Sequence, residues 1–163
     1  MKVLDGMSGV LELAWDAHQV AFSSEGVYVA SRLVDGVFPD YRQIMPSSAQ
    51  TVAVVLKSDL VSALRLTQIF SDKLNQVALA INPTANSFEI TSHNDIGENV
   101  SRLEATLQGD EVGISFNIRY LLECLGSVAS DSISLKFNAK HKPILVSGVG
   151  DNSFHYLIMP LNR

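Results

Sequence analysis

Hydrophobic and polar positions alternate over short runs in the first 35 residues, which predicts a β-rich beginning to the chain. Breaks rich in Asp, Ser and Gly separate these runs, as expected for turns. The predicted strands lie within GVLELAWDA (9–17), QVAFSSE (19–25) and GVYVASRLVD (26–35). Strands without a helix bury little apolar surface, so we interpret this region as part of a β-rich domain.

From position 50 onward, the same order of elements is predicted twice: one strand, one helix and three strands. Apolar residues spaced three and four apart indicate the helices, and alternating β-branched runs indicate the strands. Ser58 and Asn117 are the expected N-caps. The predicted elements are strand 50–56, helix 57–72 and strands 75–82, 86–93 and 99–107, then strand 111–117, helix 118–129 and strands 131–138, 142–148 and 153–160. We therefore predict one α+β domain of two pseudo-repeats around a single core.

The segment FPDYRQIMP (38–46) joins these two regions and carries aromatic and apolar residues between two prolines. Solvated linkers are usually rich in Gly, Ser or charge instead. Proline restricts the backbone and sets the direction of the chain. We therefore predict an ordered junction.

Composition narrows the possible functions. The chain has 163 residues, of which 47% are hydrophobic, so it can bury a domain-sized core. A net charge of −5 argues against a protein that binds nucleic acid over its whole surface. The lone cysteine, Cys124, excludes an internal disulfide framework and favours a reducing, cytoplasmic location. No run approaches the apolar length of a membrane-spanning helix, so no membrane association is predicted.

The sequence predicts no catalytic residue, no metal site and no cofactor. Cys124 falls within a predicted helix, where a small buried residue is more common than a nucleophile. The polar run SHNDIGEN (92–99) is typical of a solvated turn, and the glycines form no phosphate-binding loop. The histidines are scattered without metal-ligand spacing: His18, His93, His141 and His155.

Several segments together give the chain a resemblance to a known family. They are DGVFPDYR (35–42), FNIRYLLECL (116–125), KPILV (142–146) and the late YLIMP (156–160). The chain resembles, over essentially its whole length, the bacterial DNA polymerase III β subunit, the sliding clamp. The resemblance implies the DNA-clamp fold. It aligns 1–45 with the C-terminal part of the middle clamp domain and its linker, and 46–163 with the complete third domain, so it implies a C-terminal fragment.

The function implied by the resemblance is that of a non-catalytic processivity factor of replicative DNA polymerase. Such clamps self-associate as homodimers into a ring that encircles double-stranded DNA without sequence specificity. DNA polymerase, clamp loader and repair proteins attach to the ring through short linear motifs that enter a hydrophobic groove. A groove of this kind gives a disordered peptide modest affinity by burying its large apolar side chains.

The resemblance also implies which residues line the peptide groove. One wall comes from the junction segment, the other from the end of the chain, and two more positions lie near the rim. The implied residues are Pro39, Gln43, Ile44, Tyr120, Pro143, Leu157, Met159, Pro160 and Leu161. The chain departs from the family at Gln43, where a basic residue is common, and at Leu161 and Asn162, where methionine and arginine are common. Charge pairing with partner peptides at these positions is therefore in question.

Two further sets of residues are implied by the resemblance. Ile69 and Phe70 correspond to the hydrophobic contact that closes the ring, and the alternative is that both are ordinary core. The residues expected to face DNA weakly are Arg65, Arg119, Lys57 and Lys73, and the alternative for each is a solvated charge on a helix.

Taken without the resemblance, the residues also fit a stand-alone α+β peptide-binding module that is not linked to DNA. An upstream reading frame encoding two more domains of the same repeat would favour the clamp over this alternative.

Overall fold

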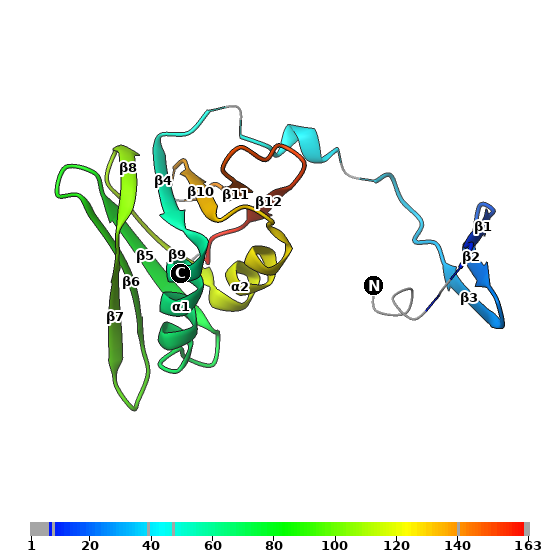
Figure 1. Ribbon diagram of the computed structural model, residues 1–163, viewed down its shortest axis with the longest axis horizontal. Helices are drawn as coiled ribbons and strands as arrows, with labels where there is room; N and C mark the ends of the chain where they lie inside the picture. The colour runs from blue at the N-terminus through cyan, green and yellow to red at the C-terminus, as the bar shows by residue number, and fades with distance from the viewer. Residues whose placement is uncertain (1–6, 8, 39, 47, 140, 162–163) are drawn as a thin grey trace. The chain divides into compact units, whose positions relative to one another are not determined.

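The computed structural model describes residues 7, 9–38, 40–46, 48–139 and 141–161 (Figure 1). The chain divides into two compact units, Met1–Asp40 and Tyr41–Arg163. Each unit is described separately below. Among the described residues, no helix is long and apolar enough to cross a membrane.

The first unit contains an antiparallel sheet of three strands, β1 (Glu12–Trp15), β2 (Gln19–Ser24) and β3 (Val27–Arg32). Its register places Leu13 opposite Phe22, and Phe22 opposite Val29, so one face is apolar. The other face carries a row of alanines, Ala14, Ala21 and Ala30. The strands predicted from the alternating pattern are therefore present.

The second unit contains two antiparallel sheets and two α-helices. Its elements are β4 (Thr51–Leu56), α1 (Lys57–Gln68), β5 (Gln76–Asn82), β6 (Ser87–His93), β7 (Glu98–Leu103), β8 (Ala105–Gly109), β9 (Val112–Asn117), α2 (Ile118–Ser127), β10 (Ser132–Phe137), β11 (Ile144–Gly148) and β12 (His155–Ile158). One sheet has the order β12-β11-β10-β4-β8 and the other β7-β6-β5-β9. The predicted α+β fold with two repeats of strand, helix and strands is confirmed.

The two repeats exchange their first strands. Strand β4 of the first repeat pairs with β10 of the second, and β9 of the second repeat pairs with β5 of the first. The first residue of each helix is bound in the same way: Lys57 N–H donates to the Asp131 carbonyl (2.8 Å) and Ile118 N–H to the Asn75 carbonyl (2.9 Å). Neither repeat can therefore complete a sheet without the other, and the unit folds around one core.

The core is made by the inward faces of both sheets and by one face of each helix. Leu64 of α1 and Leu121 of α2 are fully buried, with Phe88, Phe116 and Phe137 from the sheets. The helices contact each other, and α1 also packs on β6 and β7 (Figure 1). Burial of each such side chain contributes about 1.5–3 kcal/mol to folding.

The predicted N-cap at Asn117 is correct, and the one at Ser58 is wrong. The Asn117 side chain accepts a hydrogen bond from Arg119 N–H (3.0 Å). The cap residue of α1 is instead Leu56, two residues earlier, and the helix begins at Lys57 directly after β4 without a side-chain cap. The Ser58 hydroxyl donates to the Asp59 carboxylate (2.9 Å). Both helices follow directly after a strand, but the cap position of α1 is occupied by Leu56, whose side chain has no hydrogen-bond acceptor, whereas that of α2 is occupied by Asn117.

The single strand predicted over 99–107 is interrupted at Glu104. Leu103 lies opposite Phe88 in the four-stranded sheet, whereas Ala105 lies opposite Val55 in the five-stranded sheet. Alternation of inward and outward side chains continues through this junction. The chain therefore crosses from one sheet to the other at Glu104, and the alternating sequence pattern gives no sign of this crossing.

Candidate functional site

The junction segment is ordered in the part that belongs to the second unit. Residues Tyr41–Gln43 form a turn of 3-10 helix, and the Tyr41 carbonyl accepts hydrogen bonds from Ile44 N–H and Met45 N–H, both at 3.2 Å. This turn leaves the Ile44 side chain 60% exposed. A large aliphatic side chain held in solvent by an ordered turn is a feature typical of a binding surface.

A hollow of about 370 Å³ lies between this segment and the turn that joins β10 to β11. Its lining residues are Gln43, Ile44, Met45, Pro46, Ser48, Gln50, Asn138, Ala139, Lys142 and Pro143. The hydrogen bond from Gln50 N–H to the Phe137 carbonyl (2.9 Å) joins the two segments at one end of the hollow. Apolar and polar side chains therefore meet in one concave site, as in many ligand-binding clefts.

The end of the last strand extends this surface. Ile144 pairs with Ile158, so Pro143 and Met159 are the next residues at the same end of β11 and β12. Met159 is 61% exposed, whereas its neighbour Pro160 is buried. Leu161 N–H then donates to the Ser115 carbonyl of β9 (2.8 Å), which anchors the tail. The exposed Met159 thus lies between Ile158, which is paired in the sheet, and Leu161, whose N–H is bound to β9.

The structure brings some of the predicted groove residues together and separates others. Gln43, Ile44 and Pro143 line the same hollow. Leu157 and Met159 lie on the neighbouring strand and its extension, and Leu161 lies on the tail. Tyr120 is half-exposed on α2 and adds a small contribution to the pKa of Tyr156, which is raised mainly by burial. Pro39 lies outside the described residues.

Sequence reasoning did not find several residues that line the hollow. They are Met45, Pro46, Ser48, Gln50, Asn138, Ala139 and Lys142. They belong to two segments far apart in the sequence, and no local spacing signals that these segments meet. The apolar residues of the junction and its two prolines were the only usable sign.

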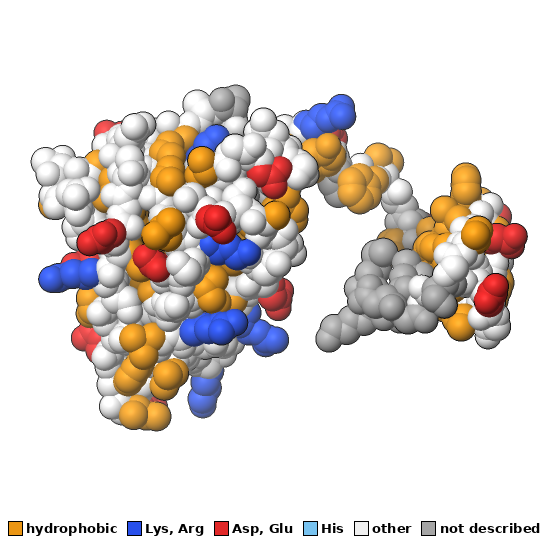
Figure 2. All heavy atoms as spheres, viewed as in Figure 1, with side chains coloured by type: hydrophobic (Ala, Val, Ile, Leu, Met, Phe, Trp, Pro, Cys, Tyr) orange, Lys and Arg blue, Asp and Glu red, His pale blue; other side chains and the backbone are white. Residues whose placement is uncertain are grey.

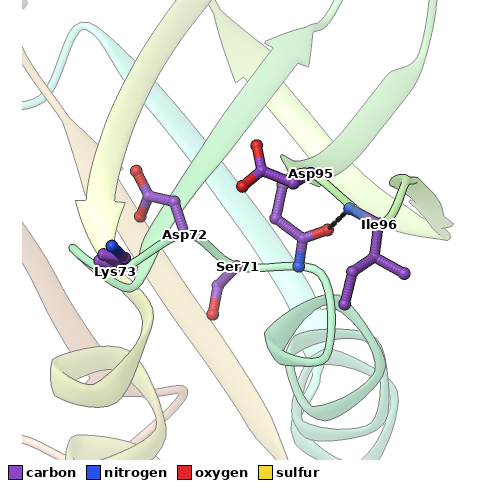
Figure 3. Close-up of a pocket in the computed structure, with 6 residues that line it drawn as sticks. Ser71, Asp72, Lys73, Asp95 and Ile96 are labelled. Atoms are coloured by element: carbon purple, nitrogen blue, oxygen red, sulfur yellow. Dashed lines mark hydrogen bonds between the residues drawn. The ribbon is translucent and has the colours of Figure 1, made fainter.

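The end of α1 presents Ile69 but only partly Phe70. Ile69 is 67% exposed, and Phe70 is half-buried with its ring over Gly97, where an added Cβ would lie 3.5 Å from the ring. The next residues, Ser71–Lys73, face the turn between β6 and β7 across a second hollow of about 410 Å³ (Figure 3). The Asn94 side chain holds that turn by accepting from Ile96 N–H (2.9 Å). The exposed residue Ile96 lies beside the same hollow.

A buried polar cluster holds the end of α1 on the adjacent sheet. The Thr67 hydroxyl lies 2.7 Å from the Ala63 carbonyl and 3.0 Å from Asn99 Oδ1. The Ser92 hydroxyl donates to the Thr67 carbonyl (2.7 Å), and the Ser101 hydroxyl donates to Asn99 Oδ1 (2.9 Å). These bonds hold the last turn of α1 on β6 and β7.

The basic residues in and next to the helices differ in their exposure and in their hydrogen bonds. Arg65, Arg119 and Lys73 are exposed. Lys57 instead donates its ammonium to the Val128 carbonyl at the C-terminal end of α2, where a cation is favoured by the helix dipole. Figure 2 shows Lys and Arg side chains over the region of the two helices, with Asp and Glu side chains among them.

The described residues contain no group of three or more His, Cys, Asp or Glu side chains that could hold a metal ion. Burial raises the pKa of the Cys124 thiol to about 12, so the thiolate nucleophile is disfavoured there. Burial also raises the pKa of Tyr156, with smaller contributions from Cys124, Glu123 and Tyr120.

Comparison with known proteins assigns the family. The beta sliding clamp of Synechococcus elongatus is 28% identical over 163 residues, which cover 99% of this chain and 44% of that protein. The beta sliding clamp of Streptomyces coelicolor is 30% identical over 148 residues, covering 87% and 39%. Residues 42–162 match the family described as DNA polymerase III beta subunit, C-terminal domain. The chain belongs to the bacterial sliding clamp family.

Solved sliding clamps share the fold. The crystal structure of the DNA polymerase sliding clamp from Bacillus subtilis superposes with a TM-score of 0.85 at 28% identity, covering 99% of this chain and 43% of that one. The structure of Caulobacter crescentus pol III beta gives a TM-score of 0.85 at 25% identity, covering 99% and 44%. The chain therefore spans less than half the length of the sliding clamps it matches. The family resemblance recognised in the sequence is confirmed.

Proposed function

We propose that this chain acts as part of a processivity factor for replicative DNA polymerase, a non-catalytic clamp that forms a ring around DNA. Membership of the sliding clamp family supports this. In the same proposal, residues 1–45 are the C-terminal part of a middle clamp domain with its linker, and 46–163 are a third domain.

We further propose that polymerase, clamp loader and repair proteins attach through short linear motifs at a hydrophobic groove. The observation that carries this proposal is a pair of exposed apolar residues: Ile44, 60% exposed, lines the hollow described above, and Met159, 61% exposed, follows β12 across from Pro143, which also lines it. The proposed lining residues are Pro39, Gln43, Ile44, Pro143, Leu157, Met159, Pro160 and Leu161, with Tyr120 at the rim. Methionine suits such a site because its flexible side chain adapts to different ligands.

A titration with a pentapeptide-like motif ending in Leu-Phe tests the groove. We expect weak, saturable binding by fluorescence anisotropy, and at least a tenfold loss in Ile44→Asp and Met159→Asp, because a carboxylate opposes the apolar contact. Ile96→Asp is the matched control, since Ile96 is also exposed but lies beside the other hollow. Equal affinity in all these variants would exclude the groove.

The proposal assigns ring contact to Ile69 and Phe70 and weak phosphate contact to Arg65, Arg119, Lys57 and Lys73. The exposure of Ile69 supports the first assignment. The hydrogen bond of Lys57 to the Val128 carbonyl makes Lys57 the weakest of the four DNA candidates. DNA binding by this chain is expected to be weak, to weaken further with salt and to be independent of sequence.

The alternative is a peptide-binding module unconnected to DNA. It would use the same groove, and no feature of the described residues favours it over the clamp. Non-specific duplex binding that falls in Arg65→Gln and Arg119→Gln favours the clamp. Undetectable duplex binding at low salt, with peptide binding intact, favours the module.

A further inference from the structure

The hollow beside Ile44 contains a single formal charge among its described lining residues, the ammonium of Lys142. The other polar side chains are neutral: Gln43, Ser48, Gln50 and Asn138. None of the described residues that line the hollow carries a carboxylate, although the chain as a whole has a net charge of −5. The site is therefore locally positive in an acidic protein, and such local fields select ligands by charge.

Lys142 is held in place by its backbone and leaves its side chain available. Its N–H donates to the Ala139 carbonyl (2.8 Å), which closes the turn between β10 and β11, and Pro143 restricts the next backbone angle. The side chain is exposed. An ion pair joins Arg102 to Glu89 on the other sheet, and the described residues place no carboxylate in an ion pair with Lys142. The Lys142 ammonium thus has no carboxylate partner within the described part of the chain.

We infer that this hollow selects partner peptides that carry an Asp or Glu next to their apolar anchor residues, and that Lys142 pairs with that carboxylate. The inference rests on the proposed groove. Ile44 offers apolar contact, and the side-chain amides of Gln50 and Asn138 can bond the peptide backbone. Because Lys142 carries the positive charge of the described lining, the position of the peptide carboxylate relative to Lys142 determines the register in which the peptide binds.

An acidic peptide fits this surface better than a nucleic acid does. Duplex binding depends on several cations spaced along the phosphates, and its affinity rises with their number. Here a single described cation stands beside an exposed isoleucine and a half-buried methionine. This combination matches an apolar anchor followed by one carboxylate.

The test uses the whole chain and two peptides of equal length with the same Leu-Phe anchor. One peptide has a flanking Asp and Glu, and the other has Asn and Gln at these positions. We expect the acidic peptide to bind about three- to tenfold more tightly at low salt, as for a partly exposed ion pair. The difference is expected to shrink at high salt. Lys142→Gln should remove the preference, so that the acidic and the neutral peptide bind this variant with equal affinity.

Two further variants complete the design. Lys73→Gln makes the same change of charge beside the other hollow, so it should retain the preference for the acidic peptide. Lys142→Glu should reverse the preference when a peptide with flanking lysines is included. Circular dichroism and thermal unfolding check that each variant is folded, which the exposure of both lysines favours.

The outcomes separate the inference from the groove itself. Equal binding of both peptides to the unchanged protein, or a preference that survives Lys142→Gln, overturns the inference while the groove stands. If neither peptide binds, the proposed groove fails and the inference fails with it. A short DNA duplex whose binding falls in Lys142→Gln, with peptide binding unaffected, would assign the charge to nucleic acid and also overturn the inference.

Discussion

Leu161 donates its backbone N–H to the carbonyl of Ser115 at 2.8 Å, so the tail after β12 is bound to β9 of the other sheet. The first repeat crosses between the sheets at the corresponding place. There, β8 follows β7 and pairs with β4. Both repeats therefore end on the first strand of their own repeat, and in the second repeat this contact holds Met159 at the proposed groove.

Replacing Leu161 by proline removes this donor. We expect a loss of about 1 kcal/mol in the free energy of unfolding, the usual net value of one hydrogen bond. Leu161→Ala keeps the N–H and serves as the control for lost side-chain contacts. Amide hydrogen exchange of Leu161 in the unchanged protein should be slowed, and an unprotected amide would show that the tail is not anchored.

Asn117 and Ser58 offer a matched pair for testing the helix caps. Asn117→Ala removes the bond to Arg119 N–H and another from its amide to the Leu74 carbonyl (3.2 Å). We expect a destabilisation of about 1–2 kcal/mol in urea unfolding. Ser58→Ala should change stability by less than about 0.5 kcal/mol, because Ser58 caps nothing. Equal effects in the two variants would contradict the assignment.

The buried cluster around Thr67 should respond strongly to loss of its hydroxyl. Thr67→Val keeps the shape but removes the donor shared with the Ala63 carbonyl and Asn99. We expect a loss of about 1–3 kcal/mol, measured by thermal or urea unfolding, because a buried acceptor loses a partner. Thr106→Val, at an exposed position of β8, is the control and should be nearly neutral.

Ile69 and Phe70 are expected to behave differently when replaced. Ile69→Asp should leave the unfolding free energy within about 0.5 kcal/mol, because the side chain is 67% exposed. Phe70→Ala should destabilise by about 1–2 kcal/mol, because its half-buried ring covers Gly97. Sedimentation analysis then tests the proposed ring contact: any self-association of the chain should fall in Ile69→Asp. A large stability loss in that variant would instead make Ile69 part of the core.

The pKa of Cys124, raised from 9.0 to about 12 by burial, predicts a dependence of stability on pH. The folded protein keeps this proton in a range where the unfolded chain loses it. The contribution of the buried Cys124 thiol to the free energy of unfolding is therefore fully present below pH 9 and is lost as the pH rises toward 12. Urea unfolding between pH 8 and 10.5 should show a smaller decline in Cys124→Ala. A thiol reagent at pH 8 should react slowly with the folded protein and quickly in denaturant.

The amino-acid pattern alone was enough to place most elements of the second unit. Alternation predicted strands such as β5 and β6, and the three-and-four spacing predicted both helices. These signals are local, because each records which side of an element faces the core. The family motifs added the prediction of a groove at the junction and the final strand. The end of α1 at Gln68, four residues before the predicted end, depends on the turn that follows it.

Only the tertiary structure decided which strands are neighbours. An alternating pattern is the same whichever strand lies alongside, so the exchange of β4 and β9 between repeats and the break at Glu104 left no local sign. For the same reason, the sequence did not identify Lys142 as a residue of the proposed site. It shows only a lysine in a turn, and long-range contacts bring this lysine into the same hollow as Ile44. The sequence determined the elements and their buried faces, whereas tertiary packing determined the partners of each edge and the charge of the proposed site.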